Sequence, residues 1–289
     1  MADERDAPGG AAPGRAGPGE RPAPEPRPVD RATARRRIEA DAVARFKARP
    51  ADTGIRRTGR ALEAHEPAPT TEWIVVVPVK GTTGAKSRFG GDPARREALA
   101  AAVALDTLDA VSRTEGVVAV LVVTSPEGAA ALDDSDALVL VEDEPAGLGA
   151  AVELGVETAA AMGAPGRGIA VLLGDLPALR PGELAAALAA AREHDRAFVP
   201  DASGTGTSLI TAADGVAHAA AFGAGSAAAH AAAGYSPLEV DPGSGLRRDV
   251  DDRAALDAIA GRVGPRTADW LDTGDSEGKS SNPLADSNA

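Results

Sequence analysis

Basic side chains gather in one glycine-containing stretch of the chain, PVKGTTGAKSRFGG, at residues 78–91. Lys80, Lys86 and Arg88 lie within nine residues of one another and bracket two glycines. Ammonium and guanidinium groups, together with exposed glycine amides, are the groups that bind phosphate in proteins. The stretch follows directly after the apolar run WIVVVPV (73–79). We therefore expect it to bind a nucleoside triphosphate, with a solvated surface turn as the alternative.

Two separate segments carry aspartates suited to a metal ion. Asp175 ends the apolar run IAVLLGD, and Asp249 and Asp251 lie two residues apart in LRRDVDD. Residues two apart on an extended segment share a face. Mg²⁺ prefers carboxylate, water and phosphate oxygens, so Asp175 and Asp249, with Asp251 as a further ligand, are expected to hold it beside an incoming phosphate. The alternatives are a turn-capping aspartate and an exposed acidic turn.

Glycine, serine and threonine recur in PDASGTGTSLI (200–210) and FGAGSAAAH (222–230). Glycine lets the backbone approach a small ligand closely. Ser226 is expected to cap a helix whose first amides face a phosphate or carboxylate. Loops without a binding role have the same composition, so these segments alone leave both interpretations open.

The elements that must position these residues alternate between two kinds. Short β-branched runs occupy 73–79, 117–124, 137–141 and 169–175, with weaker candidates at 197–200 and 207–211. Ala- and Leu-rich helical stretches occupy 94–112, 148–161, 182–194, 222–233 and 252–260. Near-continuous apolar strands alternating with helices predict an α/β fold with a doubly wound, mostly parallel sheet. Ligands of such sheets bind beyond the carboxyl ends of the strands.

Composition excludes several classes of protein. The chain has 289 residues, a net charge of −13, seven aromatic residues and no cysteine. Disulfide scaffolds, thiolate zinc sites and cysteine nucleophiles are therefore excluded. Residues 71–289 carry 16 Lys and Arg against 32 Asp and Glu, which disfavours a nucleic-acid surface. No apolar run approaches the roughly 20 residues of a membrane span, and a cytoplasmic protein is expected.

The chain divides into three parts by composition. Residues 1–70 form an extension rich in Pro, Arg and Ala that is expected to be disordered, with a helical stretch at 31–48. Residues 71–273 are expected to form one α/β domain, and the polar residues 274–289 to form a second disordered tail. The extension is either an interaction arm or an upstream start without consequence.

Common nucleotide and hydrolase motifs fail on spacing. GTTGAKS has two residues between its glycines where a Walker A motif has four, and Ala85 precedes the lysine. No GxGxxG follows the first apolar run, no GxSxG is present, and the four histidines show no paired-ligand spacing. Dehydrogenases, P-loop NTPases, serine hydrolases and zinc hydrolases are therefore disfavoured.

Five motifs in a fixed order resemble those of the guanylyltransferases of coenzyme F-420 biosynthesis. They are PVK…GAKSR, GDLPAL, the D-x-x-GTGT loop, FGxGSAxAH and LRRDVD, between about Trp73 and Trp270. This family is related to molybdopterin and sugar-phosphate nucleotidylyltransferases, which share a Rossmann-like sheet of the nucleotide-diphospho-sugar transferase type. GDLPAL is widespread among nucleotidylyltransferases, whereas GTGT followed by FGxGSAxAH is more specific.

The resemblance implies a reaction and a set of roles. GTP and phosphoenolpyruvate, or 2-phospho-L-lactate in archaeal-type members, give a guanosine diphosphate diester and pyrophosphate. Asp175 and Asp249 would bind Mg²⁺. Phosphoenolpyruvate would contact Thr207, Gly223 and Ser226, and the GTP phosphates would contact Lys80, Lys86 and Arg88. A homodimer, or a partner enzyme of the same pathway, is expected.

One departure and two alternatives accompany the resemblance. Relatives open the helix after the third strand with Gly-Leu-Asn, whereas this chain has Gly149 in place of the asparagine. A different phosphate acceptor, such as 3-phosphoglycerate, a sugar phosphate or a pterin phosphate, is the enzymatic alternative. A non-catalytic regulator that retains the fold is the other, although Lys86, Asp175 and Asp249 are intact.

Overall fold

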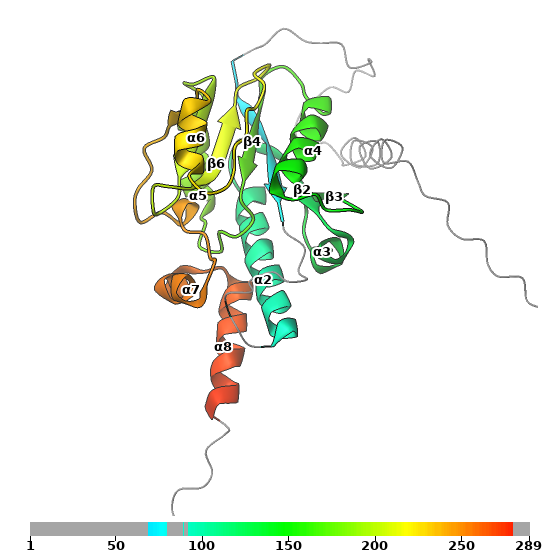
Figure 1. The fold of residues 1–289 in the computed structure, drawn as a ribbon, viewed down its shortest axis with the longest axis vertical. Helices are drawn as coiled ribbons and strands as arrows, with labels where there is room; N and C mark the ends of the chain where they lie inside the picture. The colour runs from blue at the N-terminus through cyan, green and yellow to red at the C-terminus, as the bar shows by residue number, and fades with distance from the viewer. Residues whose placement is uncertain (1–68, 80–88, 90–91, 280–289) are drawn as a thin grey trace, which may run out of the picture.

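A computed structural model describes residues 69–79, 89 and 92–279 of the chain (Figure 1). The helical stretch expected at 31–48, the residues Lys80, Lys86 and Arg88, and the last ten residues lie outside this part. Among the described residues, no helix combines the length and the apolar character needed to cross a membrane.

Seven strands form one sheet in the order β3-β2-β1-β4-β6-β5-β7. Their bounds are β1 Glu72–Pro78, β2 Val117–Thr124, β3 Leu138–Val141, β4 Arg167–Leu172, β5 Arg196–Pro200, β6 Thr207–Ala212 and β7 Ser236–Pro237. Every neighbouring pair is parallel except the two that involve β6, which runs antiparallel to β4 and β5. The predicted mostly parallel α/β sheet is therefore confirmed.

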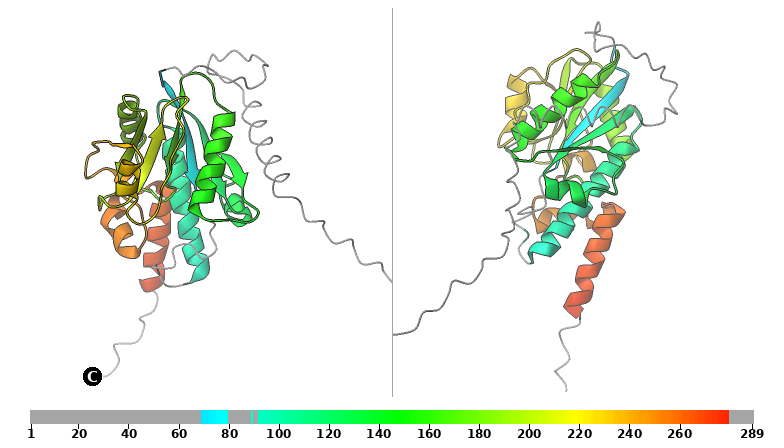
Figure 2. Two further views of the ribbon diagram at one scale, coloured as in Figure 1. Left: turned by 45° about the horizontal axis from the view of Figure 1, so that its top comes forward. Right: turned by 90° about the vertical axis from the view of Figure 1, so that its right-hand side faces the viewer.

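Helices cover both faces of the sheet. Their bounds are α2 Pro93–Ser112, α3 Pro126–Ala131, α4 Leu148–Ala161, α5 Pro181–Ala191, α6 Ser226–Ala232, α7 Arg253–Ile259 and α8 Pro265–Lys279. Alternate residues of β1 point to opposite layers: Trp73 belongs to the cluster with α2 and α5, and Ile74 to the cluster with α4 and α6. Figure 2 shows α4 and α2 on opposite sides of the strands. Burial on both faces explains why β1 reads as an unbroken apolar run.

A third cluster joins α2 to the C-terminal helices and fixes the segment that precedes them. Leu99 of α2 packs with Leu256 of α7 and Trp270 of α8. The buried Asp106 carboxylate of α2 accepts hydrogen bonds from the first backbone amides of α8, at Arg266 (3.1 Å) and Thr267 (2.8 Å). An acidic side chain at a helix N-terminus satisfies otherwise unpaired amides and complements the helix dipole. Helix α8 is thereby fixed beside α2 (Figure 1).

The structure differs from the sequence prediction in several elements. Helix α3, helix α8 and the two-residue strand β7 were not predicted, and α6 begins at Ser226 rather than at residue 222. Helix α8 continues to Lys279, five residues past Gly274, where a tail was expected. Helices α3 and α8 are short of large apolar residues, and α8 depends on a capping carboxylate from α2. Strand β4 ends at Leu172 rather than at Asp175, so the aspartate lies in the loop.

Candidate active site

A pocket of about 900 Å³ opens at the edge of the sheet where β1 and β4 end and β6 begins. Because β6 is antiparallel to its neighbours, its first residue lies at the same edge as the last residues of β1 and β4. The lining comprises Pro78, Val79, Ala100, Val103, Ala104, Ser125, Glu142, Pro145, Gly147, Leu148, Ala151, Leu173, Gly174, Asp175, Asp201, Thr205, Gly206, Thr207, Ser208, Phe222, Gly223, Ala224, Gly225, Ser226, Asp249 and Asp251. The pocket therefore lies where a doubly wound sheet binds its ligand.

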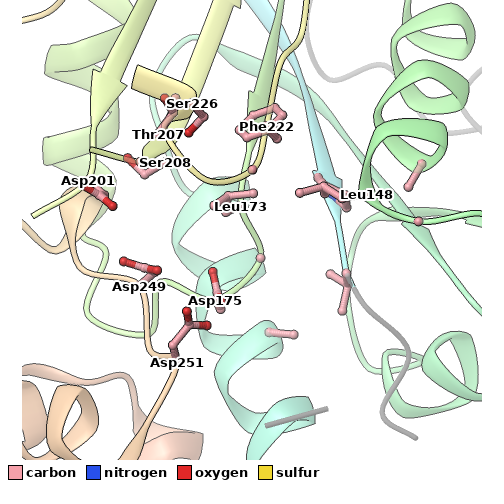
Figure 3. Close-up of a pocket in the computed structure, with 18 of the residues that line it drawn as sticks. Leu148, Leu173, Asp175, Asp201, Thr207, Ser208, Phe222, Ser226, Asp249 and Asp251 are labelled. Carbon is pink, nitrogen blue, oxygen red and sulfur yellow. The ribbon is translucent and has the colours of Figure 1, made fainter. Parts of the chain in front are cut away.

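Three aspartates meet at one end of this pocket. Asp175, Asp249 and Asp251 come from two loops and point toward one another (Figure 3). The Val250 amide donates a hydrogen bond of 3.1 Å to the Asp175 carbonyl, which holds the two loops together. Gly174 lets the loop that carries Asp175 lie close to the end of β1, since a Cβ there would lie 2.9 Å from a methyl group of Val79.

The crowded carboxylates alter the acidity of Asp249. Burial, followed by the charges of Asp175, Asp251 and Asp201, raises the pKa of Asp249 to about 6. Desolvation and like charges both disfavour the ionised form of a carboxyl. A cation placed among these oxygens would relieve both effects.

The donor set fits a hard divalent cation with an incomplete protein shell. All the side-chain donors at this end of the pocket are carboxylate oxygens, which suit Mg²⁺. In the part of the chain that the structure describes, no group of three or more His, Asp or Glu side chains is arranged to enclose a metal by itself. Mg²⁺ usually keeps several waters and takes further ligands from substrate phosphates, so two aspartates suffice for such a site.

A wall of hydroxyl groups and glycines faces the carboxylates. Thr207 begins β6 and Ser226 begins α6, and Figure 3 shows them side by side at the end of the pocket away from Asp251. Gly223 and Gly225 have φ values of 134° and 73°, which L-residues with side chains rarely adopt. The three residues that the resemblance assigned to the acceptor, Thr207, Gly223 and Ser226, thus line one pocket.

The expected capping role of Ser226 is wrong. Gly225 occupies the N-cap position, and no side chain caps the helix. The amides of Ser226 and Ala227 donate to the carbonyls of Gly223 and Thr205, both at 3.1 Å. The Ser226 side chain therefore points away from the capping position and lines the pocket, and hydroxyls rather than these two amides face a ligand.

The predicted phosphate-binding cations, Lys80, Lys86 and Arg88, lie outside the described residues. Their neighbour Val79 lines the pocket. No lysine or arginine is found among the lining residues that the structure describes. A polyanion in this pocket therefore needs positive charge from a metal ion or from residues outside the described part of the chain, such as those that follow Val79.

Four lining residues were not singled out from the sequence. Asp201 adds a fourth carboxylate, and its side chain accepts hydrogen bonds from the Ser203 hydroxyl (2.8 Å) and the Thr205 amide (3.2 Å). Ser125 and Glu142 follow β2 and β3, and burial raises the pKa of Glu142. The ring of Phe222 lines the pocket next to the hydroxyl wall (Figure 3). Asp201 and Phe222 carried a sequence signal, as the first residues of the D-x-x-GTGT loop and of the FGxGSAxAH motif.

Fold and site together define the class. Residues 82–239 match the MobA-like NTP transferase domain. A crystal structure described as that of a nucleotide-diphospho-sugar transferase from Desulfovibrio desulfuricans G20 shares the fold, with a TM-score of 0.52 and 17% identity over 72% of this chain and 96% of that one. The protein is a nucleotidyltransferase.

Curated relatives narrow the family. Phosphoenolpyruvate guanylyltransferase of Salinispora arenicola is 49% identical, covering 69% of this chain and 93% of its own length. The enzymes of the same name from Streptomyces coelicolor and Sanguibacter keddieii are 45% and 43% identical and cover 68% and 69% of this chain, with 94% and 84% of their own lengths matched. The chain belongs to the phosphoenolpyruvate guanylyltransferase family.

Proposed function

We propose that this protein transfers GMP from GTP to the phosphate of phosphoenolpyruvate and releases pyrophosphate, forming enolpyruvoyl-2-diphospho-5'-guanosine for coenzyme F-420 biosynthesis. The observation that carries the proposal is the meeting of Asp175 and Asp249 with Thr207 and Ser226 in one pocket of about 900 Å³. One end suits a metal-bound phosphate, and the other suits a small anion held by hydroxyl groups. Relatives of that name at 43–49% identity support the choice of substrates.

Mg²⁺ is the proposed cofactor, held by Asp175 and Asp249. When bound, it neutralises phosphate charge and polarises the phosphoryl group under attack. The raised pKa of Asp249 supports this assignment, because a cation offsets the repulsion among the aspartates.

The remaining roles are proposed from the pocket lining, except those of the basic residues, which rest on the sequence. The hydroxyl groups of Thr207 and Ser226 donate hydrogen bonds to the acceptor's anionic oxygens, and Gly223 keeps that wall open. Lys80, Lys86 and Arg88 are proposed to bind the triphosphate. The guanine base is proposed to lie toward Leu148, on the side opposite the hydroxyl wall (Figure 3). Ser125 and Glu142 line the same pocket.

The chemical step needs positioning and charge stabilisation more than proton transfer. An oxygen of the acceptor phosphate attacks the α-phosphorus of GTP, a P–O bond forms there, and the α–β bond breaks as pyrophosphate leaves. A phosphate monoester is already anionic, so no general base is required. Holding the two substrates in line lowers the entropic barrier, and fixed charges stabilise the developing negative charge on the leaving group.

Mass spectrometry of the products tests this function. The protein is incubated with Mg²⁺, GTP and phosphoenolpyruvate, with parallel reactions on 2-phospho-L-lactate and 3-phosphoglycerate, and ATP replaces GTP as the control. The expected result is a guanosine diphosphate adduct of phosphoenolpyruvate with release of pyrophosphate. Faster adduct formation with another acid would identify that acid as the acceptor. Absence of an adduct with all three acids would refute the proposal.

The proposed function also implies a cellular location and an oligomeric state. We expect the reaction to take place in the cytoplasm, on small-molecule substrates, without nucleic acid or membrane. A homodimer, or an association with another enzyme of the same pathway, is expected; analytical ultracentrifugation of the purified protein tests the first.

A further inference from the structure

A fully buried histidine lies directly behind the hydroxyl wall of the pocket. His230 of α6 is 0% exposed, and its Nδ1 lies 3.0 Å from the Thr207 hydroxyl oxygen. Its Nε2 lies 2.9 Å from the Ala221 amide nitrogen. Phe222 and Tyr235 enclose the ring edge-on, at centroid distances of 5.1 Å and 5.3 Å. One ring thus contacts both β6 and the segment that leads into the glycines of the site.

The hydrogen-bond partners determine where the protons lie. A backbone amide can only donate, so Nε2 of His230 must accept from Ala221 and carries no proton. A neutral imidazole then carries its proton on Nδ1. Burial lowers the pKa of His230, which favours the neutral ring. Nδ1 therefore donates to the Thr207 oxygen.

The direction of this hydrogen bond determines whether the Thr207 hydroxyl acts as a donor or an acceptor toward a ligand. Its oxygen accepts the hydrogen bond from Nδ1–H of His230, and its own hydroxyl proton has no acceptor among the residues that the structure describes. Thr207 is 3% exposed and lines the pocket. The hydroxyl therefore faces the pocket as a donor, which suits a carboxylate or phosphate oxygen because such oxygens only accept.

We propose that His230 is a positioning residue of the acceptor site: it fixes the Thr207 hydroxyl as a donor toward the acceptor's anionic oxygens, and it holds the segment before Gly223 through the Ala221 amide. This inference rests on the proposed function, in which Thr207 contacts the phosphorylated acid. His230 touches neither substrate; it acts through the two walls that do.

Two substitutions separate the two halves of this role. In His230→Asn the side-chain nitrogen reaches the Nδ1 position and keeps the bond to Thr207, while the bond from Ala221 is lost. In His230→Gln the side-chain oxygen reaches the Nε2 position and keeps the Ala221 bond, while the donor to Thr207 is lost. We expect KM for phosphoenolpyruvate to rise about tenfold in His230→Gln, as for loss of one oriented hydrogen bond to a charged group. It should rise no more than about threefold in His230→Asn.

A double-mutant cycle distinguishes positioning from general support of the fold. Thr207→Val removes the hydroxyl, so adding His230→Gln to it should raise KM for phosphoenolpyruvate less than about twofold more. KM for GTP should stay unchanged throughout. Equal effects of His230→Gln with and without the Thr207 hydroxyl, or parallel losses for both substrates, would overturn the proposal.

Nitrogen NMR of the histidine ring in the full chain tests the proton assignment without any turnover. The expected spectrum shows a neutral His230 with the proton on Nδ1, assigned by its disappearance in His230→Gln. A proton on Nε2, or a doubly protonated ring at pH 7.5, would overturn the inference about His230 alone. A wild-type protein with the expected tautomer but no product from phosphoenolpyruvate would overturn the proposed function instead.

Discussion

Replacing Asp249 with asparagine should make the metal-free protein more stable while it removes activity. The pKa of Asp249 rises from 3.8 to about 6 because of burial and its acidic neighbours. That rise corresponds to about 3 kcal/mol against the ionised form. The carboxyl keeps some contact with solvent, so screening reduces the gain from Asp249→Asn to about 1–2 kcal/mol.

The sign of this effect depends on pH. Above pH 6 the folded metal-free protein carries an ionised, crowded Asp249, and the destabilisation is present in full. As the pH falls through 6 toward 3.8, the folded state takes up the proton before the unfolded state does, and the destabilisation disappears. The advantage of the asparagine variant should therefore be largest above pH 6 and vanish near pH 4.

Thermal unfolding in EDTA, at pH 7.5 and at pH 4, measures the effect. We expect the midpoint of Asp249→Asn to be roughly 2–8 °C higher than wild type at pH 7.5. Added Mg²⁺ should raise the wild-type midpoint more than that of the variant, and pyrophosphate release should fall at least about 100-fold. A lower midpoint in EDTA, or an equal response to Mg²⁺, would refute the reasoning from crowded carboxylates.

Asp252 provides the matched control, since it lies in the same segment but outside the pocket lining. Its carboxylate caps α7 by accepting from the Ala255 amide at 2.9 Å. Asparagine caps helices equally well, so Asp252→Asn removes one negative charge with a change in stability within about 0.5 kcal/mol.

Four further changes test other parts of the molecule. Asp175→Asn should keep the circular dichroism of the wild type and lose at least about 100-fold in turnover, because a proposed metal ligand is removed; unchanged turnover would exclude Asp175 from the proposed metal site. Gly149→Asn should fold and lower KM for GTP several-fold, since nothing lies within 4 Å of a Cβ there and the family resemblance implies an asparagine near the nucleotide at this position; Gly149→Ala is the control that should leave KM unchanged. His218 has a pKa lowered to about 4 by burial, so its neutral form stabilises the fold above pH 6.5 and this contribution is lost as the pH falls toward 4; urea unfolding should show wild type losing about 2 kcal/mol more than His218→Gln between pH 7 and pH 5. Deletion of residues 1–66, which spares the buried Thr70, should leave kcat/KM within about twofold of wild type, and a folded but inactive product would assign the extension a role in catalysis.

The parts of the fold that follow from local pattern were predictable from the sequence. Strands buried on both faces appear as apolar runs, and β2 and α4 have the bounds that the sequence predicts. Helix α8 was missed because its stability depends on tertiary contacts: Asp106 of α2 caps its first turn, and Trp270 packs against α2 and α7. Neither contact leaves a local signal.

The site was predictable in its residue types but not in its hydrogen bonds. Asp175 was predicted as a metal ligand because it ends a buried apolar run, and Asp249 because it lies two residues from Asp251; the structure brings the two loops into one pocket. The capping role predicted for Ser226 is wrong because Gly225 occupies the N-cap position with a positive φ. Glycine adopts positive and negative φ values about equally readily, so the sequence alone does not show which residue begins the helix. The contact between His230 and Thr207 depends on how α6 packs on β6, so its donor and acceptor roles emerge only in three dimensions.

The antiparallel direction of β6 affects how specificity for the acceptor could be transferred from one family member to another. Thr207 belongs to a β5–β6 hairpin whose connection, residues 201–206, is short and lies at the pocket. The strands β1, β2 and β3 are instead joined by crossovers that contain α2 and α3, and their loops line the other side. The two sides of the pocket are therefore formed by segments that are connected separately along the chain. Grafting residues 201–206 together with 221–226 from a relative of different acceptor preference should transfer that preference and leave the nucleotide side intact.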